Sequence, residues 1–345
     1  MPRNLNVYIL HANWLKDRQR VVEEFQKQIQ KYFFKDIKQT KIQVITDFDP
    51  NDINGELIQR TVNYAHYKEE DDIKEDNKTT SITFYNQFIK NMHLFQLSNV
   101  LKHLKALEFI MKNSSDDDIN IILEDDIVYQ EKMCMTLEKV FDSLPSDYDM
   151  VFMGLPTNRQ IKNPDDITYQ NTSEVFRVLP YCDSYIVSKN AATKLYNNFL
   201  PIKFTSNLQL SSLIEKLSLK TVLCIPSIFI DGSKFGLFLS TLTPNNALLF
   251  NADYMQSKQL LDTKKDVELT SEEIEKLEKI FETSPIKNHP DFMHVKAQYL
   301  VKQNKFTEAE AVFEAALKIY QANSCVVNHE SAFLKEYIKL FKELQ

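Results

Sequence analysis

The stretch Asn120-Ile121-Ile122-Leu123-Glu124-Asp125-Asp126 joins a run of large aliphatic residues directly to three carboxylates. An apolar run without alternation is typical of a strand covered on both faces, as in a parallel α/β sheet. Ligands of such sheets bind at the carboxyl ends of the strands, so the three acids are expected at a site-forming edge. A second acidic run, Asp116-Asp117-Asp118, lies at the amino end of the same strand and is interpreted as a solvated turn.

The clustered carboxylates call for a compensating charge. Two of them held about 4 Å apart repel by roughly 4 kcal/mol at an effective dielectric constant near 20, so a cation or a proton must offset them. A hard divalent ion with oxygen ligands fits this need and would also bind phosphates. We expect Asp126 to be the principal metal ligand because it lies farthest along the strand end, with Glu124, Asp125 or Asp231 assisting.

Composition narrows the class of protein. The 345 residues suffice for an α/β domain with a substantial core and a smaller appendage. The net charge of -7 argues against a nucleic-acid partner. No apolar run reaches membrane-spanning length and the start is too polar for a signal peptide, so a cytoplasmic protein is predicted. The cysteines form no CxxC pair, which predicts free thiols in a reducing compartment and no zinc site; they are Cys134, Cys182, Cys224 and Cys325.

The order of the predicted elements is that of an α/β domain. A strand at 6–10, an amphipathic helix within 14–34 and a strand at 41–45 make a βαβ unit. The strand at 120–123 follows an amphipathic helix at 97–111. Further strands are predicted at 149–154, 175–179, 183–187 and 221–225, and further helices at 131–141, 190–199 and 208–217.

Several basic and polar residues outside the acidic run are candidate donor contacts. Arg18, near the start of the first helix, is interpreted either as a phosphate or base contact or as a solvated side chain. Lys102 and His103 lie beside the apolar face of the 97–111 helix, where they are structural or reach the acidic site. The loop at 226–236 contains Ser233 and Lys234 with two of the four glycines, which suits a diphosphate contact or an ordinary turn.

The C-terminal part is predicted to be helical throughout, which gives domains at 1–250 and 251–345. Thr270-x-x-Glu273 and Thr307-x-x-Glu310 are predicted capping boxes. Ala309, Phe313 and Ala316 have the small-large-small spacing of the second helix of a tetratricopeptide repeat, with Ala297, Leu300 and Phe306 filling positions in and after the first helix. One repeat cannot bury its own face, so this part would pack on the first domain, on a partner or on a second copy of the chain. A plain helical cap is the alternative.

A family resemblance rests on the helix at 99–105 and the strand that follows it. Asn99-Val100-Leu101-Lys102-His103-Leu104-Lys105 followed by Ile122-Leu123-Glu124-Asp125-Asp126 resembles glycosyltransferase family 25, whose hallmark is a Cys-Ala-Leu-Ser-His helix before a Leu-Glu-Asp-Asp strand end. Asn99 and Lys102 depart from that helix. Residues 7–18, 149–154 and 185–195 look like the family's other core segments, and 228–241 is similar to members from large DNA viruses. The likeness covers roughly 7–251.

The resemblance implies a GT-A type, Rossmann-like α/β fold and a transferase. The implied donor is a UDP-sugar that carries galactose, glucose or N-acetylglucosamine, and the implied metal ion is Mn²⁺ or Mg²⁺. The sugar would be transferred to a hydroxyl of a glycan or protein acceptor with inversion of the anomeric centre. Glu124 and Asp125 then either orient Asp126 or bind the donor sugar. Asp183 is a candidate for the catalytic base, whereas Asn207, on the helix that often carries an acceptor-side acid, cannot be one.

Two other classes are carried as alternatives. The first is a catalytically inactive domain whose helical tail acts as a docking module. The second is a nucleotidyltransferase, which also uses paired acids after a strand; the lack of a Gly-rich P-loop or of a separate second carboxylate pair weakens it.

Overall fold

The computed structural model describes residues 3–62, 92, 94–154, 166–176, 178–233, 237–238, 252–264 and 267–322. The chain divides into two compact units, Met1–Asp231 and Gly232–Gln345. The predicted boundary at 250 falls outside the described residues. Within the described ranges, no helix has both the length and the apolar character that crossing a bilayer requires.

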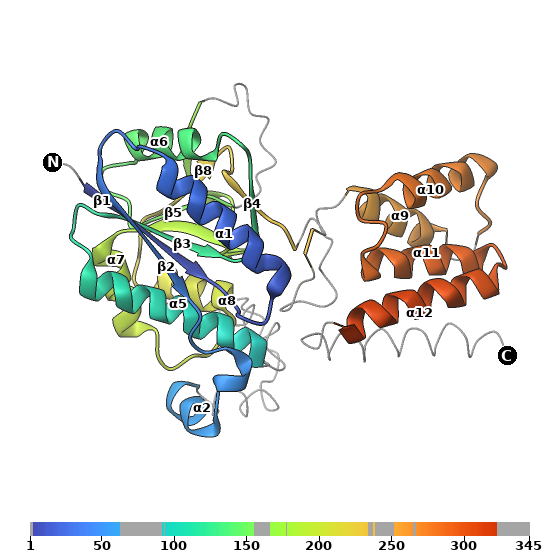
Figure 1. Cartoon of the computed structure of the whole chain (residues 1–345), viewed down its shortest axis with the longest axis horizontal. Helices are drawn as coiled ribbons and strands as arrows, with labels where there is room; N and C mark the ends of the chain where they lie inside the picture. The colour runs from blue at the N-terminus through green and yellow to red at the C-terminus, as the bar shows by residue number, and fades with distance from the viewer. Residues whose placement is uncertain are drawn as a thin grey trace, which may run out of the picture. The chain divides into compact units, whose positions relative to one another are not determined.

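The first unit is an α/β domain built on a seven-stranded sheet, as predicted (Figure 1). Its strand order is β2-β1-β3-β7-β5-β8-β6. Five strands run in one direction, whereas β7 and β6 are antiparallel to their neighbours, so the sheet is mixed rather than fully parallel. The strands are β1 (Arg3–Leu10), β2 (Ile37–Ile45), β3 (Ile119–Glu124), β5 (Met150–Phe152), β6 (Thr168–Asn171), β7 (Ser184–Val187) and β8 (Thr221–Ile225). A separate ribbon pairs β4 (Ile127–Tyr129) with β9 (Phe229–Asp231).

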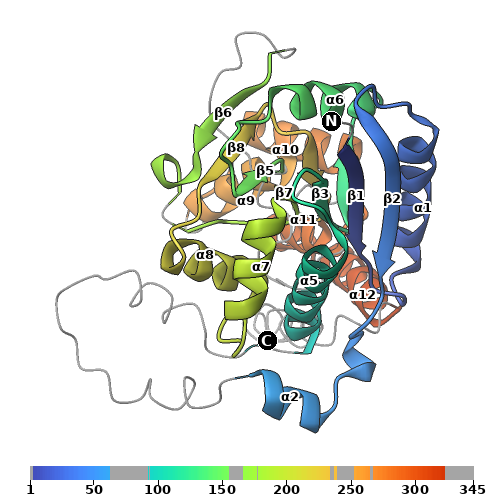
Figure 2. The same ribbon diagram turned by 90° about the vertical axis from the view of Figure 1, so that its left-hand side faces the viewer.

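Helices cover both faces of the sheet, which explains the continuous apolar run in β3. Ile122 belongs to the core beneath α5 (Leu94–Asn113), α7 (Lys189–Asn198) and α8 (Ser206–Lys216), and α5 and α7 lie side by side (Figures 1 and 2). Ile121 and Leu123 face the other core, under α1 (Lys16–Lys31) and α6 (Met133–Ser143). Shorter elements are α2 (Gly55–Thr61), η1 (Pro50–Asp52) and η3 (Thr172–Glu174).

The predicted strand at 175–179 is wrong. Val178 and Leu179 cover α8 instead, whereas Val175 is exposed: Val178 packs against Phe204 and Leu208, and the Leu179 amide donates to Ser211 Oγ at 3.0 Å. The edge of the sheet next to β8 is instead formed by β6, a polar strand that the hydrophobic pattern of the sequence did not predict. An edge strand can be polar because its outer side faces water.

The interpretation of the second acidic run as a solvated turn is correct for Asp116 and Asp117, which are exposed, and wrong for Asp118. The Asp118 carboxylate is buried and accepts hydrogen bonds from the Asn4 amide at 3.1 Å and the Ser115 amide at 2.9 Å. It thereby closes the turn before β3 and fixes that turn to β1. Asp118 is thus a structural residue at the amino edge of the sheet.

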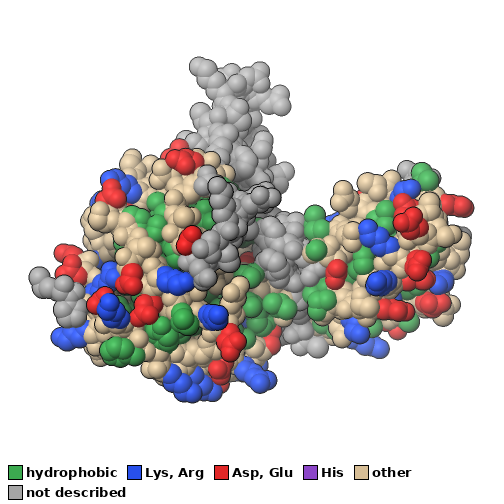
Figure 3. Space-filling view, turned by 90° about the horizontal axis from the view of Figure 1, so that it is seen from above, with side chains coloured by type: hydrophobic (Ala, Val, Ile, Leu, Met, Phe, Trp, Pro, Cys, Tyr) green, Lys and Arg blue, Asp and Glu red, His purple; other side chains and the backbone are tan. Residues whose placement is uncertain are grey.

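The second unit is helical, as predicted. Its helices are α9 (Ala252–Thr263), α10 (Ser271–Thr283), α11 (Pro290–Lys302) and α12 (Phe306–Ala322). They share a core of large side chains, among them Leu277, Phe281, Phe292 and Tyr299. On the face drawn in Figure 3, acidic and basic side chains of this unit are interspersed, as on an ordinary solvated surface.

The two predicted capping boxes have different outcomes. Thr270 forms the complete box with Glu273 and begins α10. Thr307 lies inside the first turn of α12, which already begins at Phe306, so its predicted cap is wrong. Burial of Ala309, Phe313 and Ala316 agrees with the repeat-like spacing, but Phe306 is 38% exposed and fills no core position.

Candidate functional site

Four carboxylates from three segments of the first unit meet at the carboxyl edge of β3: Glu124 and Asp126, Asp183, and Asp231. The Glu124 amide donates to the Asp183 carbonyl at 2.7 Å, which sets the end of β3 beside the start of β7. Asp183 reaches this edge because β7 runs antiparallel to β3. In the β4–β9 ribbon, Ile127 lies opposite Asp231, and this pairing brings Asp231 next to Asp126. Asp231 and Asp126 were predicted as metal ligands and Asp183 as a base.

Two carboxylates of this cluster, Asp126 and Asp183, have a raised pKa. Burial and the charge of Asp231, opposed by Arg18, raise the pKa of Asp126 to about 7. Burial and the charges of Asp231, Glu124 and Asp126 raise the pKa of Asp183 well above its ordinary value. Both side chains are buried. The cluster therefore has more negative charge than its surroundings compensate, which is the electrostatic condition for binding a cation.

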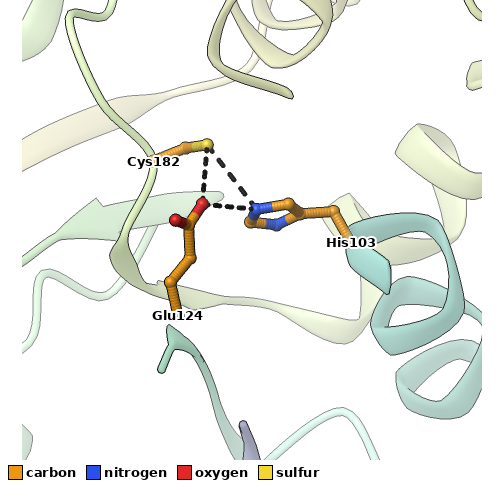
Figure 4. Close-up of side chains that lie close together, drawn as sticks. All are labelled: His103, Glu124 and Cys182. Atoms are coloured by element: carbon orange, nitrogen blue, oxygen red, sulfur yellow. Dashed lines mark hydrogen bonds and ion pairs between the residues drawn. The ribbon is translucent and has the colours of Figure 1, made fainter. Parts of the chain in front are cut away.

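Glu124 is held in its ionised form from the side of α5 (Figure 4). Burial opposes ionisation, yet hydrogen bonds from His103 and Asn99 and the attraction of His103 lower the pKa of Glu124. His103 Nε2 lies 3.1 Å from Glu124 Oε1, and His103 Nδ1 lies 3.0 Å from the Tyr185 hydroxyl. Cys182 Sγ is 3.8 Å from the same Glu124 oxygen. His103 thus contacts the site, one of the two outcomes that the sequence left open.

Asp125 points to the opposite side of the strand end and is fully engaged there. Its Oδ2 accepts from the Ala12 amide at 3.0 Å and lies 2.9 Å from His11 Nδ1, and its Oδ1 accepts from Arg18 Nη1 at 2.6 Å. Burial would raise the pKa of Asp125, but the Arg18 charge and these hydrogen bonds lower it to about 2. Asp125 therefore anchors the loop after β1 and the start of α1.

Arg18 bridges the two aspartates that follow Glu124. Its Nη1 lies 3.6 Å from Asp126 Oδ2 in addition to its bond to Asp125. The guanidinium is buried, and although burial favours its neutral form, the charges of Asp125 and Asp126 raise its pKa further. The interpretation of Arg18 as a solvated side chain is thus wrong, because the paired aspartates draw it inward.

Lys102 and His103 both lie inside the fold rather than beside an apolar face, because each has a buried polar partner. The Lys102 ammonium donates to Asp49 Oδ1 at 2.9 Å and to the Asp47 carbonyl at 2.6 Å. Asp49 also accepts from the Asn13 amide at 3.1 Å. Lys102 thereby joins the loops that follow β1 and β2.

Of the two predicted diphosphate contacts in the 226–236 loop, Ser233 is buried and Lys234 lies outside the described residues. Two residues of the site were missed from the sequence. His11 carried a usable signal, since it is the polar residue that directly follows the apolar strand β1. Cys182 carried none, because a single cysteine in a loop is usually only a small buried hydrophobe.

Gly154, just after β5, makes room for the Asp183 side chain. A Cβ atom on Gly154 would collide with Asp183 Oδ2 and Ser184 Oγ. We expect Gly154→Ala to destabilise the first unit by about 1–3 kcal/mol, as overpacking typically does. Chemical denaturation followed by circular dichroism measures this.

Gly55→Ala is the matched control, because nothing lies within 4 Å of a Cβ at Gly55. Equal stability of the two variants would contradict the steric role of Gly154.

Comparisons with known proteins give little similarity. No family model matches the chain, and no curated protein matches its sequence. Among solved structures, residues 1–349 of S. aureus TarS are similar at 10% identity with a TM-score of 0.35, covering 97% of this chain and 91% of that one. TarS 1–349 in complex with UDP-GlcNAc is similar at 10% identity with a TM-score of 0.32, covering 97% and 92%. Likeness at this level carries no argument about this chain, so its function must be argued from the site.

Proposed function

We propose that this chain is a metal-dependent glycosyltransferase that moves a hexose from a UDP-sugar to a hydroxyl of a glycan or protein acceptor, with inversion. Residues 1–250 would form the catalytic domain and 251–345 a helical extension. The observation that carries the proposal is the cluster of Glu124, Asp126, Asp183 and Asp231 at the carboxyl edge of the sheet, in which Asp126 and Asp183 are buried and the other two half-buried. Burying like charges costs stability, so such a cluster is expected where the charges serve binding or catalysis.

The residues present fit a hard divalent cation. Asp126, Asp231 and Glu124 offer carboxylate oxygens, the donor type that Mg²⁺ and Mn²⁺ prefer. Burial and the charge of Asp231 raise the pKa of Asp126, and a bound cation would offset both effects. A bound ion of this kind supplies Lewis-acid stabilisation of the negative charge that develops on the leaving diphosphate.

The other residues of the site support this chemistry by position. Arg18 is locked by Asp125, so its positive charge stays at the site edge without reorganisation during the reaction. Asp183 is the candidate general base, which would accept the proton of the acceptor hydroxyl. Its raised pKa favours that role, because a carboxylate with a higher pKa takes up a proton more readily. The space left by Gly154 keeps its side chain at this edge.

The test is a panel of UDP-sugars with UDP release as the readout, in Mn²⁺, in Mg²⁺ and with a chelator. We expect metal-dependent release from UDP-galactose, UDP-glucose or UDP-N-acetylglucosamine. We also expect UDP with Mn²⁺ to raise the melting temperature, because a ligand that binds the folded state stabilises it by mass action. UDP without the ion is the control. A chain that releases no UDP and shows no shift would be the inactive docking protein instead.

A further inference from the structure

We infer a second cation site beside the all-oxygen cluster, formed by His103, Glu124 and Cys182 and selective for a thiophilic ion of the Zn²⁺ class. The three side chains converge from α5, from the end of β3 and from the loop before β7 (Figure 4). Cation binding at this site does not depend on the proposed function. The effect of the bound cation on transferase activity rests on that function.

The spacing of the three donor atoms matches a tetrahedral ion. His103 Nε2, Glu124 Oε1 and Cys182 Sγ are separated by 3.1, 3.6 and 3.8 Å. Ligand atoms bonded to tetrahedral zinc at ~2.0–2.3 Å lie roughly 3.4–3.6 Å from one another. Shifts of a few tenths of an ångström would therefore complete the geometry, with a fourth position left for water.

Tyr185 supplies the support that a histidine ligand needs. A metal-bound imidazole donates its other N–H to a neighbouring acceptor, which fixes the ring and its tautomer. His103 Nδ1 lies 3.0 Å from the Tyr185 hydroxyl, and the two rings are stacked. Without an ion, a neutral imidazole would donate from Nε2–H to Glu124 and accept from the tyrosine at Nδ1. With an ion, Nδ1–H donates to the tyrosine oxygen and Nε2 binds the metal. The same contacts serve both states.

The donor set decides which ion binds. Mg²⁺ and Mn²⁺ prefer oxygen ligands, whereas thiolate and imidazole suit Zn²⁺. Cys182 would bind as the thiolate and release its proton to solvent, with the neutral imidazole of His103 and the carboxylate of Glu124 as the other two ligands. The absence of a CxxC pair predicted no zinc site, because such a pattern contains only ligands that are close in the sequence. Here His103 and Cys182 lie 21 and 58 positions from Glu124.

Occupation of this site would inhibit the transferase. Glu124 belongs to both clusters, and a zinc ion would hold its Oε1 on the side of α5. The all-oxygen cluster would then lose one anionic donor. Zn²⁺ is therefore expected to reduce the Mn²⁺-dependent activity through Cys182, not only by competing for the all-oxygen site.

The binding test uses Co²⁺ as a spectroscopic probe, since thiolate ligation gives it a charge-transfer absorption that oxygen ligands do not. The full chain is titrated with Co²⁺ and then with Zn²⁺, which should displace it. We expect the thiolate band in the wild type and in Cys134→Ser, Cys224→Ser and Cys325→Ser, and its loss in Cys182→Ser. No band in the wild type, or a band that survives Cys182→Ser, overturns the site.

Two further measurements separate a metal site from a plain hydrogen-bonded cluster. Tyr185→Phe keeps the buried ring and should weaken Zn²⁺ affinity by about 10–100-fold, as loss of a partner behind a metal ligand does. Unchanged affinity overturns the role of Tyr185.

The second measurement titrates Zn²⁺ into the Mn²⁺-dependent reaction. The Zn²⁺ concentration that halves the rate should be about tenfold higher for Cys182→Ser than for the wild type, each compared with its own rate without Zn²⁺. Equal sensitivity overturns the inhibitory role. A thiolate band without UDP release would reject the proposed function and retain the site.

Discussion

Replacing Asp126 by Asn is expected to reduce metal-dependent UDP release by at least about 10³-fold. Lewis-acid stabilisation of the leaving group is worth several kcal/mol, and each 1.36 kcal/mol is about a factor of ten in rate. Asn keeps the shape of the side chain but removes the negative charge at the centre of the cluster. The measurement is the initial rate of UDP release at saturating Mn²⁺, with the fold checked by circular dichroism.

The same substitution should raise the stability of the metal-free protein while removing the stabilisation by Mn²⁺ and UDP. The gain follows because burial and the charge of Asp231 disfavour an ionised carboxylate at Asp126, and Asn carries no charge there. Asp117→Asn is the matched control: it removes one charge at the other end of β3, where Asp117 is exposed, and should change neither rate nor stability. Undiminished activity of Asp126→Asn would remove the proposed site.

Replacing Arg18 by Met is expected to destabilise the first unit by about 3–5 kcal/mol. Removing one partner of a buried ion pair leaves an uncompensated charge, and here the Asp125 carboxylate, bonded to Arg18 at 2.6 Å, would be left with its negative charge buried. Urea denaturation measures the loss. Arg20→Met is the matched control, since Arg20 is exposed on the same helix and should cost little.

A double substitution distinguishes the ion pair from simple packing. In Arg18→Met with Asp125→Asn, the uncompensated charge on Asp125 is gone, so part of the stability should return relative to Arg18→Met alone. Additive effects of the two substitutions would show that the pair is not coupled and that Arg18 contributes mainly through its buried stem.

The sequence predicted those features that depend on local pattern. The aliphatic run before Glu124 predicted a strand covered on both faces, and β3 has helices on each side. Its acidic end was expected at the site edge, and the structure brings Asp126, Asp183 and Asp231 to that edge. The capping box at Thr270 was likewise predictable, because its hydrogen bonds join residues of a single four-residue segment.

Features set by distant residues could not be predicted in this way. The direction of β7 depends on its neighbours, yet it alone decides that Asp183 reaches the site. The apolar residues at 175–179 look like a strand, but α8 provides the surface that Val178 and Leu179 cover. Burial of Lys102 is permitted by Asp49, 53 positions away, and no short window of sequence contains both.

The strand order has a consequence for synthesis on the ribosome. β5 pairs with β7 on one side and with β8 on the other, and β4 finds its partner only in β9. The nascent chain must therefore emerge as far as Ile225 before the middle of the sheet can close, and as far as Asp231 before the ribbon can form. Until then, unpaired strand edges stay open, and exposed edges favour aggregation. The carboxylate cluster is thus completed last during synthesis, by a strand that emerges after all strands of the main sheet.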